Sequence, residues 1–190
     1  IGYEGRDITL QELDEAFARS YMRGPDARCI QTLAGGYIGF NRLAIMGLSS
    51  LGMQPFSLKG NQVVCNGEIF GFRLIRRQLI EQGYEFRSNS DCEVLLPLYE
   101  EYGVEMFKML DAEFAIIIYD RPSGKFVAAR DPIGIRPLFY AYSKSGNIMF
   151  ASEAKVLMPL AEKVYPFPPG HYYKDGKFVC YCDIAHVDKY

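Results

Sequence analysis

The sequence predicts an α+β fold in which two antiparallel sheets stack between outer layers of helices. Helical periodicity lies mainly in the first half of the chain, and strand-like segments dominate the second half, so the pattern is not βαβ-wound. Three turn sequences in the second half each separate two strand-like runs, which is typical of hairpins. Residues 114–119 are apolar without alternation, so another layer must cover each face of this strand.

The first predicted helix has clear start and stop signals. Thr9 and Glu12 form a capping box at its beginning. Gly24-Pro25 ends it, with Gly as the C-cap and Pro as the stop. Four apolar residues at helical spacing form its inner face: Leu10, Leu13, Phe17 and Tyr21.

Three more helical segments follow. Residues 71–82 form a second helix that ends at Gly83 and turns Phe72, Ile75 and Leu79 inward. Ser90 and Glu93 make another capping box, which starts a third helix. The inner face of this third helix consists of Val94, Leu95, Leu98 and Tyr102. Residues 104–110 are a short further helix.

Strands account for most of the remaining segments. Ile1-Gly2-Tyr3 resembles the interior of a strand, residues 36–46 have β-branched and aromatic content, and residues 62–65 form a short strand. The three hairpins turn at residues 121–124, at residues 144–146 and at Asp175-Gly176, a type I′ signal. Residues 130–137 carry three charges around a Pro-Ile-Gly turn and predict a buried ion-pair network.

Composition narrows the class of function. The chain has 190 residues, 49% of them hydrophobic, and a formal net charge of -2, which favours one globular domain over residues 1–190. This charge argues against nucleic-acid binding, and no apolar run has the length of a membrane span. Without a visible signal peptide, five scattered cysteines lacking a CxxC pattern favour a reduced, cytoplasmic setting.

A metal site near the C-terminus is conceivable but is not the favoured interpretation. Cys180 and Cys182 share one face of a strand, and His171 and His186 lie nearby in the sequence. Their spacings match no zinc pattern, so packing explains these residues better and no metal is predicted.

The dipeptide Asn66-Gly67 permits two interpretations. Asn-Gly between apolar residues is a strong hairpin signal, and from these residues alone a turn is favoured. An Asn side-chain amide beside a Gly backbone N–H is also a suitable pair of donors for a developing oxyanion.

Eight motifs occur in one order along the chain: RGPD at Arg23, RLAIMG at Arg42, GMQPF at Gly52, NGEIF at Asn66, SDCEVLLPLYEEYG at Ser90, RDPIGIRPLFY at Arg130, FASEAKVL at Phe150 and PPGHYY at Pro168. In this order they resemble the glutaminase domain of class II glutamine amidotransferases, most closely that of glutamine-hydrolysing asparagine synthetases. RDPIGIRPL alone would also suit phosphoribosylpyrophosphate amidotransferases, whereas FASEAK with PPGHYY favours the synthetase branch.

The resemblance implies a four-layer αββα sandwich of the N-terminal-nucleophile type. It also implies hydrolysis of the glutamine side-chain amide to glutamate and ammonia, for transfer to an acceptor that is expected to be ATP-activated aspartate. No cofactor is expected in this domain. ATP and magnesium would belong to a synthetase domain or subunit, whose Ser-Gly-Gly-x-Asp-Ser motif does not occur in this chain. A homodimer is a possible assembly.

The resemblance assigns roles to residues that also have ordinary structural explanations. Arg42 would bind the α-carboxylate of glutamine by two parallel hydrogen bonds, and Asp91, otherwise a first-turn acid, would bind its α-ammonium. Asn66 and Gly67 would form the oxyanion hole, and Glu68 would help to hold the amino end. The backbone that lines the pocket would comprise Arg42, Leu43, Ala44, Ile45 and Met46.

The nucleophile is expected outside this sequence. Family members begin Cys-Gly-apolar-apolar-Gly, and Ile1-Gly2 matches the last two positions, so Cys-Gly-apolar is predicted immediately upstream. Phe40 and Met22 stand where many relatives have His, Asn41 stands where they have Arg, and Ala112 stands where Gly is commoner. Three alternatives remain open. The chain could be a non-catalytic glutamine-binding or regulatory module, the glutaminase domain of another amidotransferase, or a hydrolase of another amide.

Overall fold

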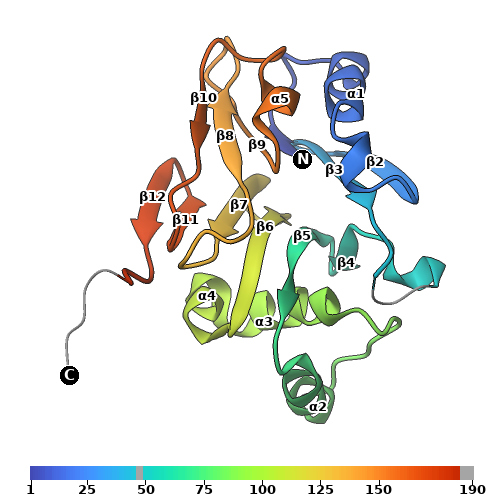
Figure 1. The fold of residues 1–190 in the computed structure, drawn as a ribbon. Helices are drawn as coiled ribbons and strands as arrows, with labels where there is room; N and C mark the ends of the chain where they lie inside the picture. The colour runs from blue at the N-terminus through green and yellow to red at the C-terminus, as the bar shows by residue number, and fades with distance from the viewer. Residues whose placement is uncertain (46–48, 185–190) are drawn as a thin grey trace.

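The computed structural model describes residues 1–45 and 49–184. Two six-stranded sheets lie face to face, and helices cover both outer surfaces (Figure 1). The helices over the first sheet are α1 (Leu10–Ala18) and α5 (Ala154–Leu157). Those over the second sheet are α2 (Phe72–Glu81), α3 (Leu95–Tyr102) and α4 (Met106–Met109). The predicted α+β sandwich with four layers is therefore confirmed.

The first sheet has the order β10-β8-β9-β1-β3-β2. Its strands, in this order, are Val164–Pro166, Phe139–Tyr142, Ile148–Ala151, Gly2–Glu4, Gly36–Arg42 and Ala27–Leu33. The second sheet has the order β12-β11-β7-β6-β5-β4. Its strands are Lys177–Cys180, His171–Lys174, Lys125–Arg130, Ala112–Asp120, Asn61–Ile69 and Phe56–Leu58. All pairs of neighbouring strands are antiparallel.

The three predicted hairpins are confirmed as β6–β7, β8–β9 and β11–β12. In the last one Asp175 and Gly176 both have positive φ, at 50° and 79°, which agrees with the expected type I′ turn. The sequence pattern did not predict β2, β4 or β10. β4 and β10 have only three residues each, too few to show a period, and β2 mixes polar and apolar residues.

Three hydrophobic clusters correspond to the three interfaces between layers. One lies between α1, α5 and the first sheet, one between the two sheets, and one between the second sheet and α2–α4. In β6, Ile117 and Tyr119 face the other sheet while Ile116 and Ile118 face the helices. Burial of β6 on both faces explains why its sequence lacks alternation.

The first helix is shorter than predicted. Its capping box of Thr9 and Glu12 is present, but α1 ends at Ala18, and a 3-10 turn (η1, Tyr21–Arg23) precedes Gly24. Leu13 and Phe17 are buried as expected, whereas Leu10 and Tyr21 are exposed. Leu10 is the first residue of α1, and Tyr21 lies beyond its end, in η1.

The predicted capping box of the third helix is wrong. Residues 91–94 form a 3-10 turn (η3, Asp91–Val94) before α3, and the Ser90 side chain makes no cap. Glu93 instead accepts hydrogen bonds from the backbone N–H groups of Arg87 and Ser88 and from the Ser88 hydroxyl. Tyr102, expected to face inward, is 41% exposed. The acid thus fastens the preceding loop and does not cap the helix start.

The predicted ion-pair network at residues 130–137 is only partly correct. Asp131 is 1% exposed and accepts hydrogen bonds from four backbone N–H groups: Phe114, Gly134, Ile135 and Arg136. Arg130 donates to three backbone carbonyls and not to an acid. Of residues 130–137, only Arg136 forms an ion pair with another residue of the described part of the chain, namely Glu113. Backbone groups left unpaired by the irregular turn, and not opposite charges, satisfy the buried Asp131 and the half-buried Arg130.

Candidate active site

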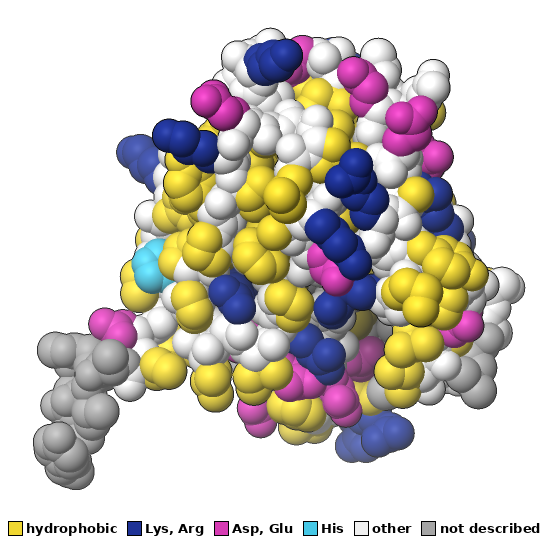
Figure 2. Space-filling model, turned by 45° about the horizontal axis from the view of Figure 1, so that its top comes forward, with side chains coloured by type: hydrophobic (Ala, Val, Ile, Leu, Met, Phe, Trp, Pro, Cys, Tyr) yellow, Lys and Arg dark blue, Asp and Glu magenta, His cyan; other side chains and the backbone are white. Residues whose placement is uncertain are grey.

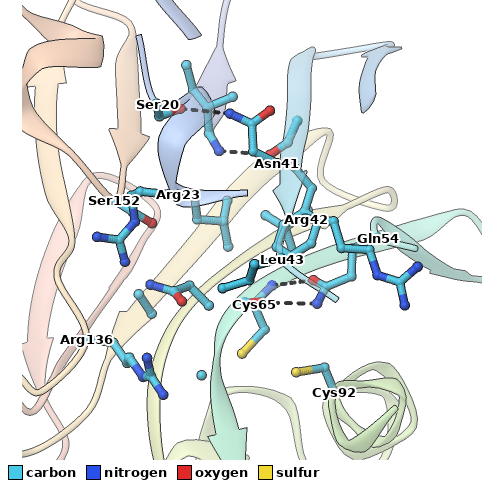
Figure 3. A pocket seen from close by; sticks show the side chains of 18 of the residues that line it. Ser20, Arg23, Asn41, Arg42, Leu43, Gln54, Cys65, Cys92, Arg136 and Ser152 are labelled. Carbon is cyan, nitrogen blue, oxygen red and sulfur yellow. Dashed lines mark hydrogen bonds between the residues drawn. The ribbon is translucent and has the colours of Figure 1, made fainter. Parts of the chain in front are cut away.

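A cavity of about 330 Å³ opens between the two sheets. One part of its wall comes from the end of β3 and the loop that follows, and the opposite part comes from β5 and η3 (Figure 3). The cavity is lined by most of the predicted site residues: Arg42, Leu43, Ile45, Asn66, Gly67, Glu68 and Asp91. Ala44, also predicted, is not among the lining residues. Three segments far apart in the sequence, around Arg42, Asn66 and Asp91, thus meet at one place. Met46 lies outside the described residues.

Asn66-Gly67 does not turn the chain. Both residues lie within the continuous strand β5, where Asn66 pairs with Ala115 of β6 and Gly67 pairs with Phe114. A Cβ atom on Gly67 would lie 2.3 Å from the carbonyl oxygen of Glu113, so only glycine fits against this neighbour. The hairpin interpretation of this dipeptide is therefore wrong, and the glycine is needed for close approach to β6.

The outer edge of β5 presents the backbone N–H of Gly67 towards the cavity. In an antiparallel strand, alternate residues direct their N–H and C=O groups to the same edge. On this edge the Cys65 N–H donates to Gln54 Oε1 at 2.6 Å, and the Ile69 N–H donates to Asp91 Oδ2 at 2.8 Å. Gly67 lies midway between these two residues, so its N–H points the same way, into the cavity.

The Asn66 side chain offers a second donor. Val64, two residues earlier, packs between the sheets, so Asn66 is directed to the same inner face of β5. Its Nδ2 atom is buried and has no hydrogen-bond partner within residues 1–45 and 49–184. Buried amides normally have partners, so an unpartnered one in a cavity wall is suited to receive a ligand oxygen.

Arg42 ends β3 and is 7% exposed. Its Nη1 atom donates to the Ser49 carbonyl at 3.0 Å, which ties the side chain to the loop following β3. That loop is anchored from the other side, because the Ala44 N–H donates to Asp26 Oδ2 at 2.8 Å and the Asp26 N–H donates to the Arg42 carbonyl. The RGPD motif, interpreted from sequence as a helix stop, thus also holds this wall of the cavity.

Asp91 is 6% exposed and contributes the opposite charge. One of its oxygens, Oδ2, accepts the Ile69 N–H, which fixes the carboxylate against the end of β5. Asp91 is the first residue of η3, the 3-10 turn that carries the chain from Ser90 into α3. Arg42 and Asp91 are therefore a buried cation and a buried anion on different walls of one cavity.

Several lining residues were not identified from the sequence. They are Gln54, Cys65, Cys92, Arg136 and Ser152 (Figure 3). Cys65 and Cys92 are both buried, and a hydrogen bond between the two thiols, together with burial, raises the pKa of Cys92 well above its usual range. The GMQPF and RDPIGIRPLFY motifs contained Gln54 and Arg136, but only the fold shows that both reach the cavity.

Within residues 1–45 and 49–184, no group of three His, Cys, Asp or Glu side chains is arranged to hold a metal ion. His186, considered with Cys180 and Cys182, lies outside these residues. The same part of the chain contains no helix with the length and apolar character needed to cross a membrane. Basic and acidic side chains are both present on the face shown in Figure 2, between hydrophobic ones.

A family model described as a glutamine amidotransferase domain matches residues 2–172. The chain belongs to the class II glutamine amidotransferases. Among its relatives in this family is a probable glutamine-hydrolysing asparagine synthetase of Dictyostelium discoideum, 40% identical over 164 residues, or 84% of this chain and 29% of the relative. Asparagine synthetase 2 of Arabidopsis thaliana is 42% identical over 153 residues, or 80% of this chain and 26% of the relative. The chain therefore spans less than a third of the length of these relatives.

Solved amidotransferase structures share the fold. The glutamine phosphoribosylpyrophosphate amidotransferase of B. subtilis, complexed with ADP and GMP, matches 95% of this chain and 48% of its own, with a TM-score of 0.78 and 20% identity. A structure described as the allosteric regulatory enzyme of purine biosynthesis matches the same shares with a TM-score of 0.80 and 20% identity. The two-sheet architecture of this amidotransferase chain is thus shared with proteins of low sequence identity.

Proposed function

We propose that this chain is the glutaminase domain of a glutamine-hydrolysing asparagine synthetase. It would hydrolyse the side-chain amide of glutamine to glutamate and deliver ammonia to a synthetase domain or subunit. The observation that carries this proposal is the convergence on one cavity of two hydrogen-bond donors, Asn66 Nδ2 and the Gly67 N–H, with a buried cation and a buried anion. The two donors would form the oxyanion hole. The names of the relatives, each a glutamine-hydrolysing asparagine synthetase, support the choice of acceptor.

The two charges suit an amino-acid zwitterion. Arg42 would pair with the α-carboxylate of glutamine, and Asp91, helped by Glu68, with its α-ammonium. Each ion is buried, so each interaction is stronger than it would be in water and depends on the presence of its partner. With both ends of the substrate held, the side-chain carbonyl oxygen would lie at Asn66 and Gly67.

The nucleophile in this proposal is a cysteine three residues upstream of Ile1. Gly2 pairs with Ile38, so residues continuing β1 backwards would pass Phe40, Asn41 and Arg42 in register. A Cβ on Gly2 would touch Ile117 of the other sheet, so Gly2 faces the space between the sheets. Every second residue upstream shares that face, and the cysteine is one of them. Its thiol would therefore point towards the wall that carries Asn66.

The reaction then proceeds through a tetrahedral intermediate. The cysteine thiolate attacks the amide carbon, and the π electrons of the carbonyl move onto its oxygen, where Asn66 and Gly67 donate hydrogen bonds. The α-ammonium of the cysteine gives its proton to the leaving nitrogen, the C–N bond breaks, and ammonia leaves a thioester. Water, deprotonated by the α-amine, attacks the thioester, and cleavage of the C–S bond releases glutamate and the thiol.

Assays of the natural full-length protein test this function. Glutamine should yield glutamate and ammonia in equal amounts, and addition of aspartate, ATP and magnesium should yield asparagine. A cysteine-directed glutamine analogue should add once to the mature N-terminus, as intact mass spectrometry would show. Glutamine binding by calorimetry without ammonia release would instead indicate a non-catalytic module. Ammonia release without asparagine formation would indicate another amidotransferase.

ATP and magnesium would bind the synthetase partner and not this chain, which is expected to need no cofactor of its own. A cytoplasmic location is supported by the five cysteines, which are all free thiols.

A further inference from the structure

We propose that Gln54 is a positioning residue for the oxyanion hole. Its side-chain amide acts as an added rung of the second sheet and fixes the stretch of β5 that carries Asn66 and Gly67. The proposal rests on the glutaminase function proposed above. Gln54 itself does not touch the reacting atoms in this proposal and acts through β5.

The edge of β5 needs such support because β4 is too short to provide it. β4 pairs with the beginning of β5 only, from Leu58 opposite Asn61 to Phe56 opposite Val63. The remaining residues of β5, up to Ile69, pair with β6 on one side, and residues 64–68 line the cavity. A strand edge that faces a cavity has unpaired backbone groups and is free to shift or twist.

Gln54 takes up the pairing where β4 stops. Its Oε1 accepts the Cys65 N–H at 2.6 Å, and its Nε2 donates to the Cys65 carbonyl at 3.2 Å (Figure 3). This pair of bonds repeats the pattern by which a neighbouring strand would hold Cys65. Gln54 is 6% exposed, so both bonds are shielded from water.

Two side chains thus hold β5 on either side of the Gly67 N–H. Gln54 holds Cys65 and Asp91 holds Ile69, each two residues away from Gly67. Cys65 also directly precedes Asn66, so a shift at Cys65 would move both oxyanion donors together. Displacement of a catalytic group by about 1 Å can lower a rate a hundredfold.

The first test uses Gln54→Met in the natural full-length protein. Met has similar length but neither donates nor accepts at Cys65, so kcat for glutaminase should fall about tenfold to a hundredfold. KM should change less than about twofold, because Arg42 and Asp91 remain in place. An aldehyde analogue of glutamine, which forms a tetrahedral adduct with the thiol, should lose as much affinity as kcat loses.

Asn61 provides a matched control at the other end of β5. It is also a buried amide, 3% exposed, which accepts the Arg121 N–H and donates to Glu100. Asn61→Leu should lower the melting temperature, as Gln54→Met does, but leave kcat of the folded enzyme and affinity for the aldehyde unchanged. If Gln54→Met retains wild-type kcat, or if Asn61→Leu lowers kcat equally, the positioning role is wrong.

A second variant keeps the test decisive if Gln54→Met does not fold. In Gln54→Glu the ionised carboxylate accepts the Cys65 N–H but repels the Cys65 carbonyl oxygen, whereas the protonated acid can make both bonds. Burial raises the pKa of such an acid above about 4.3, by up to about 3–5 units for a fully buried group, which brings its titration into the range of pH 6 to 8. The ratio of Gln54→Glu kcat to wild-type kcat should therefore rise as pH falls from 8 to 6. The other titratable groups lining the cavity are the same in both proteins and cancel in this ratio: Arg23, Arg42, Cys65, Glu68, Asp91, Cys92 and Arg136.

Asn61→Asp is the control for the pH profile, and its ratio to wild type should stay flat. A flat ratio for Gln54→Glu would overturn the proposal. The comparison of variants with wild type tests the role of Gln54 alone. The proposed function is tested by the wild-type full-length protein, which would refute glutaminase activity if it released no ammonia from glutamine.

Discussion

Asn66 directs into the cavity an amide nitrogen that has no hydrogen-bond partner among the described residues, and this atom has a defined role in the proposed reaction. Asn66→Ala should lower kcat about a hundredfold or more, as loss of one oxyanion donor typically does, and should affect KM for glutamine less. Steady-state kinetics of the full-length protein would measure both. An unchanged kcat would remove Asn66 from the oxyanion hole.

Arg42 and Asp91 should control affinity. Arg42→Lys keeps a positive charge but loses the planar pair of donors, so KM for glutamine should rise at least about tenfold. Asp91→Asn should have a similar effect because its amide oxygen can still accept the Ile69 N–H while the charge is lost. Normal glutamine binding by either variant in calorimetry would refute the role of that residue.

The cysteines should differ in reactivity towards iodoacetamide. Cys180 and Cys182 are exposed, whereas Cys65 and Cys92 are buried. The Cys92 thiol is hydrogen-bonded to Cys65 and buried, and its raised pKa keeps it protonated as pH increases from 7 to 9. Peptide mass spectrometry should therefore find Cys180 and Cys182 modified first and Cys92 still unmodified at pH 9. Unfolded protein should be modified at all five positions.

At the scale of secondary-structure elements, the stability of the β6–β7 region depends on Asp131. Asp131 satisfies four backbone N–H groups, so Asp131→Ala leaves buried donors unpaired and should cost about 3 kcal/mol or more of unfolding free energy. Chemical denaturation would measure this loss. Asp14→Ala, which removes an exposed ion pair with Arg28, should cost less than about 1 kcal/mol. Equal losses in the two variants would contradict the role of Asp131.

Local signals predicted the elements that depend on local chemistry. The Thr9 capping box and the Asp175-Gly176 turn were predicted correctly because their own few residues satisfy the backbone there. The Ser90 capping box failed because Glu93 is drawn to the loop before it. Asn66-Gly67, a strong turn signal, lies inside a strand because pairing with β6 along the whole of β5 outweighs the local preference.

At the scale of the whole molecule, aromatic contacts hold the two sheets together. Phe150 of β9 is fully buried, and its ring lies 5.4 Å from that of Tyr173, in β11 of the other sheet. Phe150→Ala should lower the unfolding free energy by about 3–5 kcal/mol. Phe70→Ala, at a 45% exposed residue, should have a much smaller effect. Calorimetry showing similar melting temperatures for both variants would refute this.

The layered architecture could be predicted because the apolar run of β6 requires cover on both faces. The site could be predicted only in part, through the resemblance, since its residues meet by tertiary contacts between distant segments. Gln54 shows most clearly which contacts the sequence could not predict. Nothing in its own neighbourhood in the sequence indicates that its side chain continues a sheet beside Cys65.

The cavity lies between the two sheets. Arg42 belongs to the first sheet, and Asp91 is hydrogen-bonded to the edge of the second. A bound zwitterion would link the two halves by its two charges, and unfolding would have to break that link. By mass action, ligand at a hundred times its dissociation constant adds about 2.7 kcal/mol to the unfolding free energy. In a cell, the survival of this protein would then depend on the size of the glutamine pool, and nitrogen supply would govern its abundance as well as its rate.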